Sequence, residues 1–257
     1  MKNDLLTIGN FTIHGYGLMI GIGIIAAYLV SEYRAKKRGL DSELLLSIAL
    51  WVVVPGLICA KLLYYITVFD DILKNPRILL DLTGGYVVYG GIIGGILGGY
   101  LFCRIKKVPF WKYFDLVIPS VALAQAFGRI GCLFAGCCYG QQTAGPLSIV
   151  FTESDFAPIG VPLVPTQPIS SGLNFIHFLI LIWFSKRATA EGQVSSLYII
   201  LYSAGRFVLE FFRGDLERGS VGTLSTSQFI SIFAFIAGIV LFTICTVRGK
   251  NRGCEDA

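Results

Sequence analysis

Arg129 is the residue whose position most demands a chemical explanation. It lies in a long apolar run, DLVIPSVALAQAFGRIGCLFAGCCYG, in which the nearest acidic residue is Asp115. An arginine at bilayer depth costs roughly 2.5 to 3.5 kcal/mol, so it normally faces a bundle interior or wet cavity and has a counter-charge or anionic ligand. Gly128 and Gly131 beside it have no Cβ and let a ligand approach closely. The pattern predicts an anion pocket; the alternative is that Arg129 snorkels to the membrane interface.

A second charged segment, YSAGRFVLEFFRGD, sets Arg206, Glu210 and Arg213 at i, i+4 and i+7. This spacing predicts that all three lie on one helical face, with a cation on either side of one carboxylate. At about 1.5 Å per residue from a cytoplasmic start near Val194, Arg206 lies at the depth predicted for Arg129. An internal ion pair between Arg206 and Glu210 explains this segment on its own. Because it leaves Arg129 without a partner, we favour one site where two planar guanidinium groups bind a phosphate.

The cysteines raise the question of a metal. The chain has seven, of which Cys132, Cys137 and Cys138 lie close together in sequence, without the spacing of a secreted disulfide framework. A closed structural zinc site needs four ligands, and the chain offers only His14 and His177 besides. We therefore expect no metal and no cofactor. Small buried packing residues are the favoured interpretation, and a disulfide from Cys132 to Cys137 or Cys138 on an oxidising face is the alternative.

The composition is that of a polytopic membrane protein. Of the 257 residues, 54% are hydrophobic and 14% are charged, whereas an average soluble domain has roughly 25% charged residues. The 30 glycines suit helices that pack through small residues. The net charge of +5 comes from basic residues in short loops, so it indicates membrane topology and no nucleic-acid partner. We expect a single all-α integral membrane domain over residues 1–257.

Apolar runs of roughly 20 residues, enough to cross a bilayer, predict about seven transmembrane helices. They fall near residues 14–32, 44–68, 86–103, 112–135, 169–185, 194–212 and 224–246. Twelve of the 21 basic residues follow the first, third, fifth and seventh runs. By the positive-inside rule, the N-terminus lies outside and the C-terminus in the cytoplasm. Arg129 is then near the outer end of its helix.

Two further segments predict specific structures: the glycine-rich third apolar run and the proline-rich connection that follows the fourth. The third run, GGYVVYGGIIGGILGGY, contains two glycine series at i, i+4 spacing: Gly90, Gly94 and Gly98, and beside them Gly91, Gly95 and Gly99. These series predict a smooth face for close helix contact, with a direct ligand role as the alternative. Tyr89 stands at the outer entrance of this face, where its phenol can reach the same cavity. Residues 140–168, rich in proline, predict an extracytoplasmic loop with a small β-hairpin or a substrate cover.

Taken in order, these motifs resemble the bacterial prolipoprotein diacylglyceryl transferases over nearly the whole chain. The matching segments are HGYGLM around Tyr16, KLLYY in the second run, GGYVVYGGIIGG in the third, D-x-x-x-P at Asp115 and Pro119, GRIG around Arg129, PTQ ending at Gln167, RFVLEFFRGD from Arg206, and LSTSQFIS near Gln228. The resemblance implies a seven-helix enzyme of the bacterial inner membrane. Such an enzyme moves the diacylglyceryl group of phosphatidylglycerol onto the lipobox cysteine thiol of an exported prolipoprotein and releases glycerol phosphate.

The resemblance also implies roles for individual residues, in an active site toward the outer face. Arg129 is expected to hold the lipid phosphate, Arg206 to assist it and Glu210 to order Arg206. Two tyrosines, Tyr16 and Tyr89, complete the expected catalytic set. The expected substrate-binding residues, besides Arg129, are Gly128, Gly131, Gly90, Gly91, Gln167 and Arg213.

The chain departs from the family's pattern at positions that concern the acceptor. After GRxG the family usually has asparagine, phenylalanine, a second asparagine and glutamate, whereas Cys132, Ala135 and Cys137 stand here. The family's third-run histidine, the expected base, is replaced by Tyr89, and a phenol with an ordinary pKa of about 10 is a poor base at neutral pH. One alternative is therefore a divergent branch with another acceptor, such as a glycan or a small thiol. A lipid or anion transporter is a further alternative, although the sequence shows no convincing internal repeat.

Overall fold

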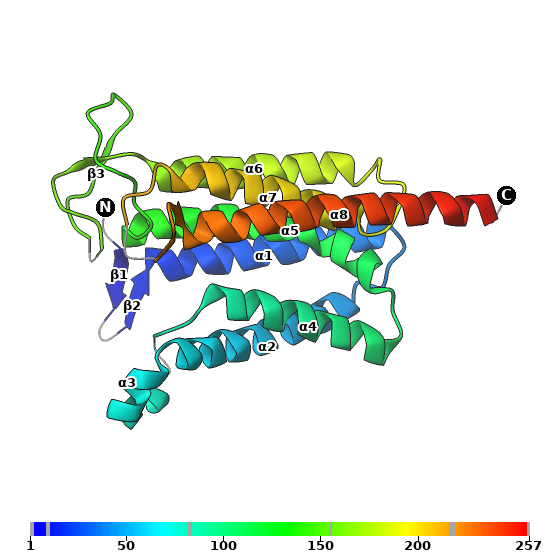
Figure 1. Ribbon diagram of the computed structural model, residues 1–257, viewed down its shortest axis with the longest axis horizontal. Helices are drawn as coiled ribbons and strands as arrows, with labels where there is room; N and C mark the ends of the chain where they lie inside the picture. Colours follow the sequence, from blue (N-terminus) through cyan, green and yellow to red (C-terminus); the bar gives the residue numbers. More distant parts are fainter. Residues whose placement is uncertain (1–2, 9–10, 82–83, 155, 216–218, 256–257) are drawn as a thin grey trace. The chain divides into compact units, whose positions relative to one another are not determined.

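The computed structural model describes residues 3–8, 11–81, 84–154, 156–215 and 219–255, and it is mostly helical (Figure 1). The chain divides into two compact units. Met1–Ser31 and Phe114–Ala257 form the first, and Glu32–Tyr113 forms the second.

Within the described ranges, six helices are long and apolar enough to cross a membrane. They are α1 (Gly15–Lys37), α2 (Leu44–Thr67), α4 (Val88–Lys106), α5 (Phe110–Ala135), α6 (Thr166–Phe184) and α8 (Thr226–Glu255). They correspond to six of the seven predicted spans. The remaining run forms α7 (Gln193–Glu210), which is long enough but less apolar because it carries polar residues such as Ser195, Tyr202 and Arg206.

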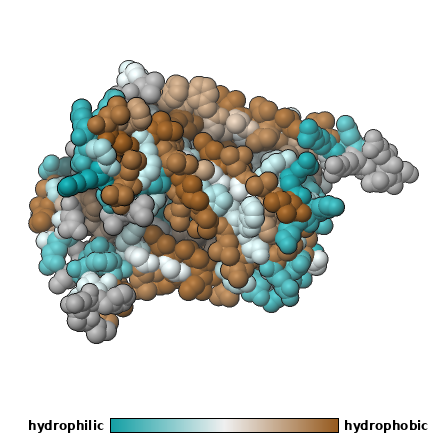
Figure 2. All heavy atoms as spheres, turned by 90° about the horizontal axis from the view of Figure 1, so that it is seen from below, coloured by the Kyte–Doolittle hydropathy of each residue, from teal (hydrophilic) through white to brown (hydrophobic). Residues whose placement is uncertain are grey.

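The helices expose apolar side chains that water would not accommodate well. On α1, for example, Ile24, Ile25 and Leu29 are 60%, 62% and 56% exposed. On the face seen in Figure 2, hydrophobic residues fill the middle, and hydrophilic residues gather toward the two ends of the helices. An exposed apolar surface of this extent is typical of contact with lipid.

The helices of the first unit lie side by side, with their axes roughly parallel (Figure 1). It begins with an antiparallel hairpin of β1 (Asp4–Ile8) and β2 (Phe11–His14), which leads directly into α1. This hairpin was not predicted, and only its last residue, His14, falls within the first predicted span, 14–32. The helices of this unit are α6, α7, α8 and the parts of α1 and α5 that belong to it, up to Ser31 and from Phe114.

Asp115 of α5 fixes where α7 begins. Its carboxylate accepts hydrogen bonds from the backbone N–H of Gly192 at 2.6 Å, the backbone N–H of Ser195 at 2.8 Å and the Ser195 hydroxyl at 2.5 Å. A carboxylate at a helix N-terminus satisfies N–H groups that have no partner within the helix. Farther along, the Tyr198 hydroxyl donates to Gln125 Oε1 at 3.0 Å. These bonds set the register of α7 against α5, and therefore the position of the charged end of α7.

The connection from α5 to α6 contains the small β-hairpin predicted for residues 140–168. β3 (Ile149–Val150) pairs antiparallel with β4 (Pro162–Leu163), over a buried cluster of Phe151, Ala157 and Leu163. The start of this connection also contacts the chain after α7, where Gly140 pairs with Arg213. A second two-stranded pair, β5 (Ser220–Val221) with β6 (Leu224–Ser225), precedes α8.

In the second unit, the glycine face of α4 packs directly against α2. A Cβ added at Gly90, Gly94 or Gly98 would collide with the backbone carbonyl oxygen of Cys59, Pro55 or Trp51 respectively. Both sets repeat every four residues, so one row of glycines lies along one row of carbonyl groups. The predicted smooth face for helix contact is confirmed.

Between α2 and α4 the chain forms α3 (Phe69–Lys74) and η1 (Pro76–Leu80). The buried ammonium group of Lys61 donates to the carbonyl oxygens of Asp81 at 2.7 Å and Gly84 at 2.6 Å. It also lies 4.9 Å from the centroid of the Tyr64 ring and 5.1 Å from that of Tyr86. Carbonyl groups and aromatic faces thus satisfy this cation, and Lys61 stabilises the connection.

Candidate active site

The first unit contains a polar pocket between α5, α6 and α7, with an empty volume of about 490 Å³ including its open mouth. Four of the predicted site residues line it, namely Arg129, Gln167, Arg206 and Arg213. The other lining residues are Cys138, Thr166, Ser170, Leu173, Asn174, His177, Tyr202, Gly205 and Leu209. Three guanidinium groups from separate parts of the sequence therefore share one chamber.

Arg129 projects from the last two turns of α5 and is partly buried. Across the part of the chain that the structure describes, it makes no ion pair and no hydrogen bond with another side chain. The unbalanced charge inferred from the sequence is thus present in the fold. It lies at a pocket wall, as expected for a group that awaits an anionic ligand.

Arg206 and Glu210 form the ion pair considered in the sequence analysis, and Arg206 still faces the pocket. The guanidinium lies 2.7 Å from the Glu210 carboxylate, and these side chains are only 15% and 8% exposed. Arg206 also donates to the Ser227 hydroxyl at 2.9 Å, and Glu210 accepts from the Ser225 hydroxyl at 3.1 Å. Ser225 at the end of β6 and Ser227 in the first turn of α8 therefore hold the pair in place.

Arg213 reaches the pocket in a different way from the one predicted. The helical face expected to carry it ends at Glu210, because α7 ends there. Arg213 lies in the segment paired with Gly140, and its Nε and terminal nitrogen donate to the two oxygens of Asp215 at 2.9 Å and 2.7 Å. Burial alone lowers the pKa of Arg213, but the hydrogen bonds to Asp215 outweigh it and hold that pKa above its ordinary value.

Gln167 lies at the start of α6, 2% exposed, and its amide donates to the carbonyl oxygen of Cys137 at 3.0 Å. Gly131 has a packing role, because a Cβ there would lie 3.2 Å from the carbonyl oxygen of Tyr16 and 3.3 Å from its ring. The first turn of α1 thus packs closely on α5. A Cβ at Gly128 would meet nothing within 4 Å, and this glycine is not a lining residue.

Tyr89, Gly90 and Gly91 belong to the second unit. Tyr89 is 38% exposed, at the start of α4. Gly90 is in the contact with α2, and a Cβ at Gly91 would lie 3.6 Å from the carbonyl oxygen of Gly56. Packing therefore requires glycine at position 90, whereas position 91 has room for a Cβ. A role for these three residues at the site stays a prediction.

The sequence analysis missed a polar stripe on α6. Gln167, Ser170, Asn174 and His177 all line the pocket. Their spacing of three, four and three residues repeats with the helical period in an otherwise apolar span, so a search for polar periodicity would have found it. His177 Nδ1 is buried and, in the described part of the chain, has no hydrogen-bond partner.

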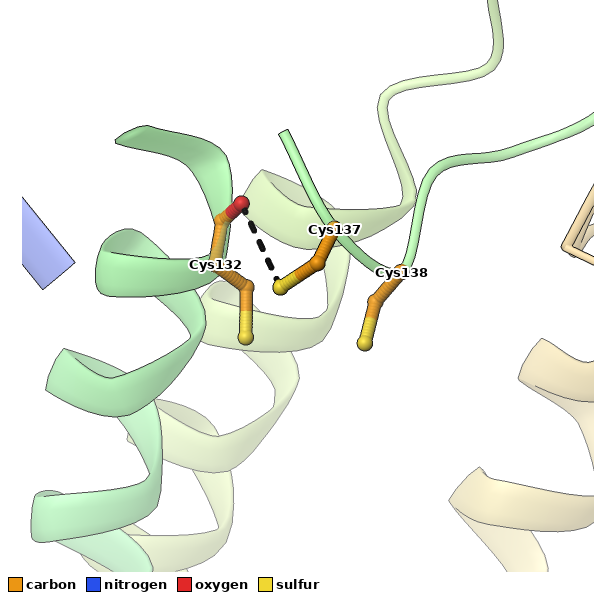
Figure 3. Close-up of side chains that lie close together, drawn as sticks. All are labelled: Cys132, Cys137 and Cys138. Carbon is orange, nitrogen blue, oxygen red and sulfur yellow. Dashed lines mark hydrogen bonds between the residues drawn. The ribbon is translucent and has the colours of Figure 1, made fainter. Parts of the chain in front are cut away.

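Three cysteine side chains, Cys132, Cys137 and Cys138, lie close together at the end of α5 (Figure 3). The sulfur atoms of Cys132, Cys137 and Cys138 are all within 4.8 Å of one another, and no disulfide joins these three described residues. Cys138 also lines the pocket. Hydrogen bonds from the thiols of Cys132 and Cys137, together with the nearby Arg213 and Arg129, lower the pKa of Cys138.

The sequence of the whole chain decides the family. The sequence model of the family described as prolipoprotein diacylglyceryl transferase matches residues 3–244. The chain belongs to this family. The resemblance deduced from the ordered motifs is thereby confirmed.

Individual diacylglyceryl transferases are similar along their entire length. The phosphatidylglycerol–prolipoprotein diacylglyceryl transferase of Clostridium tetani is 48% identical over 248 residues, which cover 96% of this chain and 99% of that protein. The second such transferase of Clostridium perfringens is 46% identical over 257 residues, covering 99% and 100%. That of Clostridioides difficile is 34% identical over 257 residues, covering both chains fully.

Proposed function

We propose that this protein transfers the diacylglyceryl group of phosphatidylglycerol to the lipobox cysteine thiol of an exported prolipoprotein. The products are a thioether-linked lipid and glycerol phosphate. Membership of the family and full-length similarity to transferases named for this reaction support the proposal.

The charge balance of the pocket is the observation that carries it. Arg206 is paired with Glu210 and Arg213 with Asp215, so Arg129 is the one guanidinium of the pocket that has no carboxylate partner among the described residues. A phosphodiester carries one negative charge, and guanidinium groups bind its oxygens in a planar, bidentate geometry. The headgroup of phosphatidylglycerol therefore supplies the charge that the pocket lacks.

The same arrangement favours the reaction over simple binding. When the bond between the glyceryl carbon and the phosphate oxygen breaks, the departing phosphate gains a second negative charge. Arg129 stabilises that charge in a site with little water, and Arg206, held by Glu210, assists. Ser170, Asn174 and His177 offer hydrogen-bonding groups to the glycerol hydroxyls.

The proposal includes a membrane topology. α7 is the seventh span, less apolar than the others because one of its faces lines the polar pocket. The N-terminus lies outside a bacterial inner membrane, the C-terminus is cytoplasmic and residues 140–168 are extracytoplasmic. The pocket then opens toward the outer face, where both the lipid and the exported acceptor are accessible.

The residues proposed to act on the acceptor thiol do not include a strong base. Tyr16 and Tyr89 are the proposed side chains, and a phenol is a weak base at neutral pH. The thiol must nevertheless become a thiolate, since the thiolate is the nucleophile. Another group is therefore required to stabilise its negative charge.

Mass spectrometry of a lipobox peptide tests the proposal. After incubation of the purified protein with phosphatidylglycerol, the peptide is expected to gain the mass of a diacylglyceryl group on its cysteine. A matched peptide with serine in place of that cysteine is expected to stay unchanged. An unmodified cysteine peptide, with intact enzyme and lipid, would reject this acceptor.

A further inference from the structure

Three cysteine thiols converge where α5 ends. The sulfur atoms of Cys132, Cys137 and Cys138 lie within 4.8 Å of one another and are partly buried. Cys132 comes from the last turn of α5, and the other two come from the loop that follows, with all three side chains directed to one side of that loop (Figure 3).

Their convergence depends on a turn held from several sides. Gly136 and Cys138 have φ values of 73° and 59°, in the left-handed region, which a residue other than glycine seldom adopts. The carbonyl oxygen of Cys137 accepts from Gln167, and that of Cys138 accepts from the Thr166 hydroxyl at 2.9 Å. The start of α6 therefore fixes the backbone that carries two of the three thiols.

We propose that Cys132, Cys137 and Cys138 bind a zinc ion whose fourth coordination position takes the acceptor thiol. Tetrahedral zinc with bonds of about 2.3 Å to sulfur places its sulfur ligands about 3.8 Å apart, so the observed separations require only small side-chain rotations. In the described ranges no histidine, aspartate or glutamate joins the cluster as a fourth ligand. Three protein ligands with an open position are the arrangement of a catalytic zinc site, whereas a structural site is closed by four.

The position of the cluster fits the reaction proposed above, on which this inference rests. Cys138 lines the same pocket as Arg129 and Arg213. A thiol bound to the metal is therefore next to a lipid whose phosphate is held by Arg129. The donor and acceptor sites share one wall.

Zinc supplies what the acceptor side lacks. Coordination deprotonates a thiol at neutral pH, and the proton passes to solvent water. The zinc-bound thiolate attacks the glyceryl carbon, a carbon–sulfur bond forms, and the bond from that carbon to the phosphate oxygen breaks. The electron pair of the broken bond stays on glycerol phosphate, which leaves as a dianion, and zinc keeps its oxidation state.

This chemistry also gives the departures from the family's pattern a common reason. By the resemblance described in the sequence analysis, asparagine and glutamate are expected where Cys132 and Cys137 stand, and a histidine base where Tyr89 stands. Zinc activation of the thiol makes that base unnecessary. The sequence-based argument against a metal was that a closed structural site needs four ligands. It does not apply to an open site with three protein ligands.

Metal binding can be measured independently of activity. The reduced, metal-free protein is titrated with Co²⁺ as a spectroscopic probe. We expect one Co²⁺ per chain, a thiolate-to-cobalt charge-transfer band in the near ultraviolet, and displacement by Zn²⁺. The variant with Cys132→Ala and Cys137→Ala should lose the band. The control with Cys59→Ala and Cys245→Ala should keep it, because both cysteines lie outside the cluster.

Transfer to the lipobox peptide provides the second readout. The Cys132→Ala, Cys137→Ala variant should still bind phosphatidylglycerol, which shows that it is folded, while its turnover falls by about 10²- to 10⁴-fold, as for loss of an acid–base group. Removing zinc from the unmodified protein should lower turnover similarly, and adding Zn²⁺ should restore it.

The inference would be overturned by the absence of a charge-transfer band, by a band that survives in the cluster variant, or by a disulfide within the cluster in protein isolated without reductant. Full transfer by the metal-free protein would overturn it while leaving the proposed function intact. Conversely, Co²⁺ binding with no transfer by the zinc-loaded protein would support the metal site and reject the proposed function.

Discussion

Replacing Arg129 by alanine should abolish activity without weakening the fold. Arg129 makes no ion pair with the described residues, so its loss breaks no charged contact within the protein. We expect the free energy of unfolding to change by no more than about 0.5 kcal/mol, as for a substitution away from a packed contact.

The effect on the reaction should be large. A hydrogen bond to a charged group contributes about 1.5–3 kcal/mol, which weakens phosphatidylglycerol binding by at least about tenfold in the variant. Losing one preorganised donor to a developing anion lowers turnover by about 10²- to 10³-fold. Together these terms predict that kcat/KM falls at least about 10³-fold.

Arg206→Ala is the informative comparison. It leaves the Glu210 carboxylate, whose side chain is 8% exposed, without its cation. Removing one partner of a buried ion pair typically costs about 3–5 kcal/mol, so this variant should lose stability as well as activity. Replacing Arg206 and Glu210 together by leucine should recover most of the stability and none of the activity.

Peptide lipidation followed by mass spectrometry, combined with thermal unfolding in detergent, separates the two effects. The reasoning fails if Arg129→Ala keeps full turnover. It also fails if Arg129→Ala unfolds as readily as Arg206→Ala, since that would make Arg129 a structural residue.

Three further perturbations test the surrounding structure. Asp115→Asn should lower the free energy of unfolding by about 1–3 kcal/mol. Both carboxylate oxygens of Asp115 accept hydrogen bonds from Gly192 and Ser195 at the start of α7, and the NH₂ group of asparagine cannot accept them. Chemical denaturation measures this change. Gly94→Val should reduce folded, membrane-inserted protein, whereas Gly128→Ala should not, since a Cβ at Gly94 collides with α2 and one at Gly128 meets nothing within 4 Å; fluorescence-detected gel filtration compares them. His177→Phe should raise the Kd for phosphatidylglycerol by about tenfold while leaving thermal unfolding unchanged, because Nδ1 has no protein partner in the described chain; equal affinity would exclude a headgroup contact.

The spans were predictable because lipid requires long apolar runs, whatever the tertiary contacts. The run 194–212 was predicted in the same way and forms α7, which is less apolar because its polar residues line the pocket and contact Asp115. The short hairpin before α1 could have been found, since Gly9 and Asn10 separate two β-branched stretches, LLTI and FTIH, as in a two-residue turn.

The pocket shows where sequence spacing stops being informative. Helical periodicity placed Arg206 and Glu210 correctly, but it failed for Arg213, because the helix ends before that residue. Gly214 is a recognisable signal of such an end. That Arg129 and Arg206 line one pocket follows from the packing of α5 against α7, which no local pattern encodes.

The cysteines show the same limit more sharply. The spacing of Cys132, Cys137 and Cys138 matches no familiar metal motif, and a helix followed by an extended loop would carry the first thiol away from the others. The left-handed conformation at Gly136 and Cys138 reverses the chain and brings the sulfur atoms together. Such a turn at a cysteine could not be predicted from residue preferences.

The most direct test of the account is an experimental structure with phosphatidylglycerol bound. Phosphate oxygens are expected about 2.7–2.9 Å from guanidinium nitrogens of both Arg129 and Arg206, as in charge-assisted hydrogen bonds. A phosphate bound elsewhere, with Arg129 facing only water or protein in the occupied complex, would contradict it.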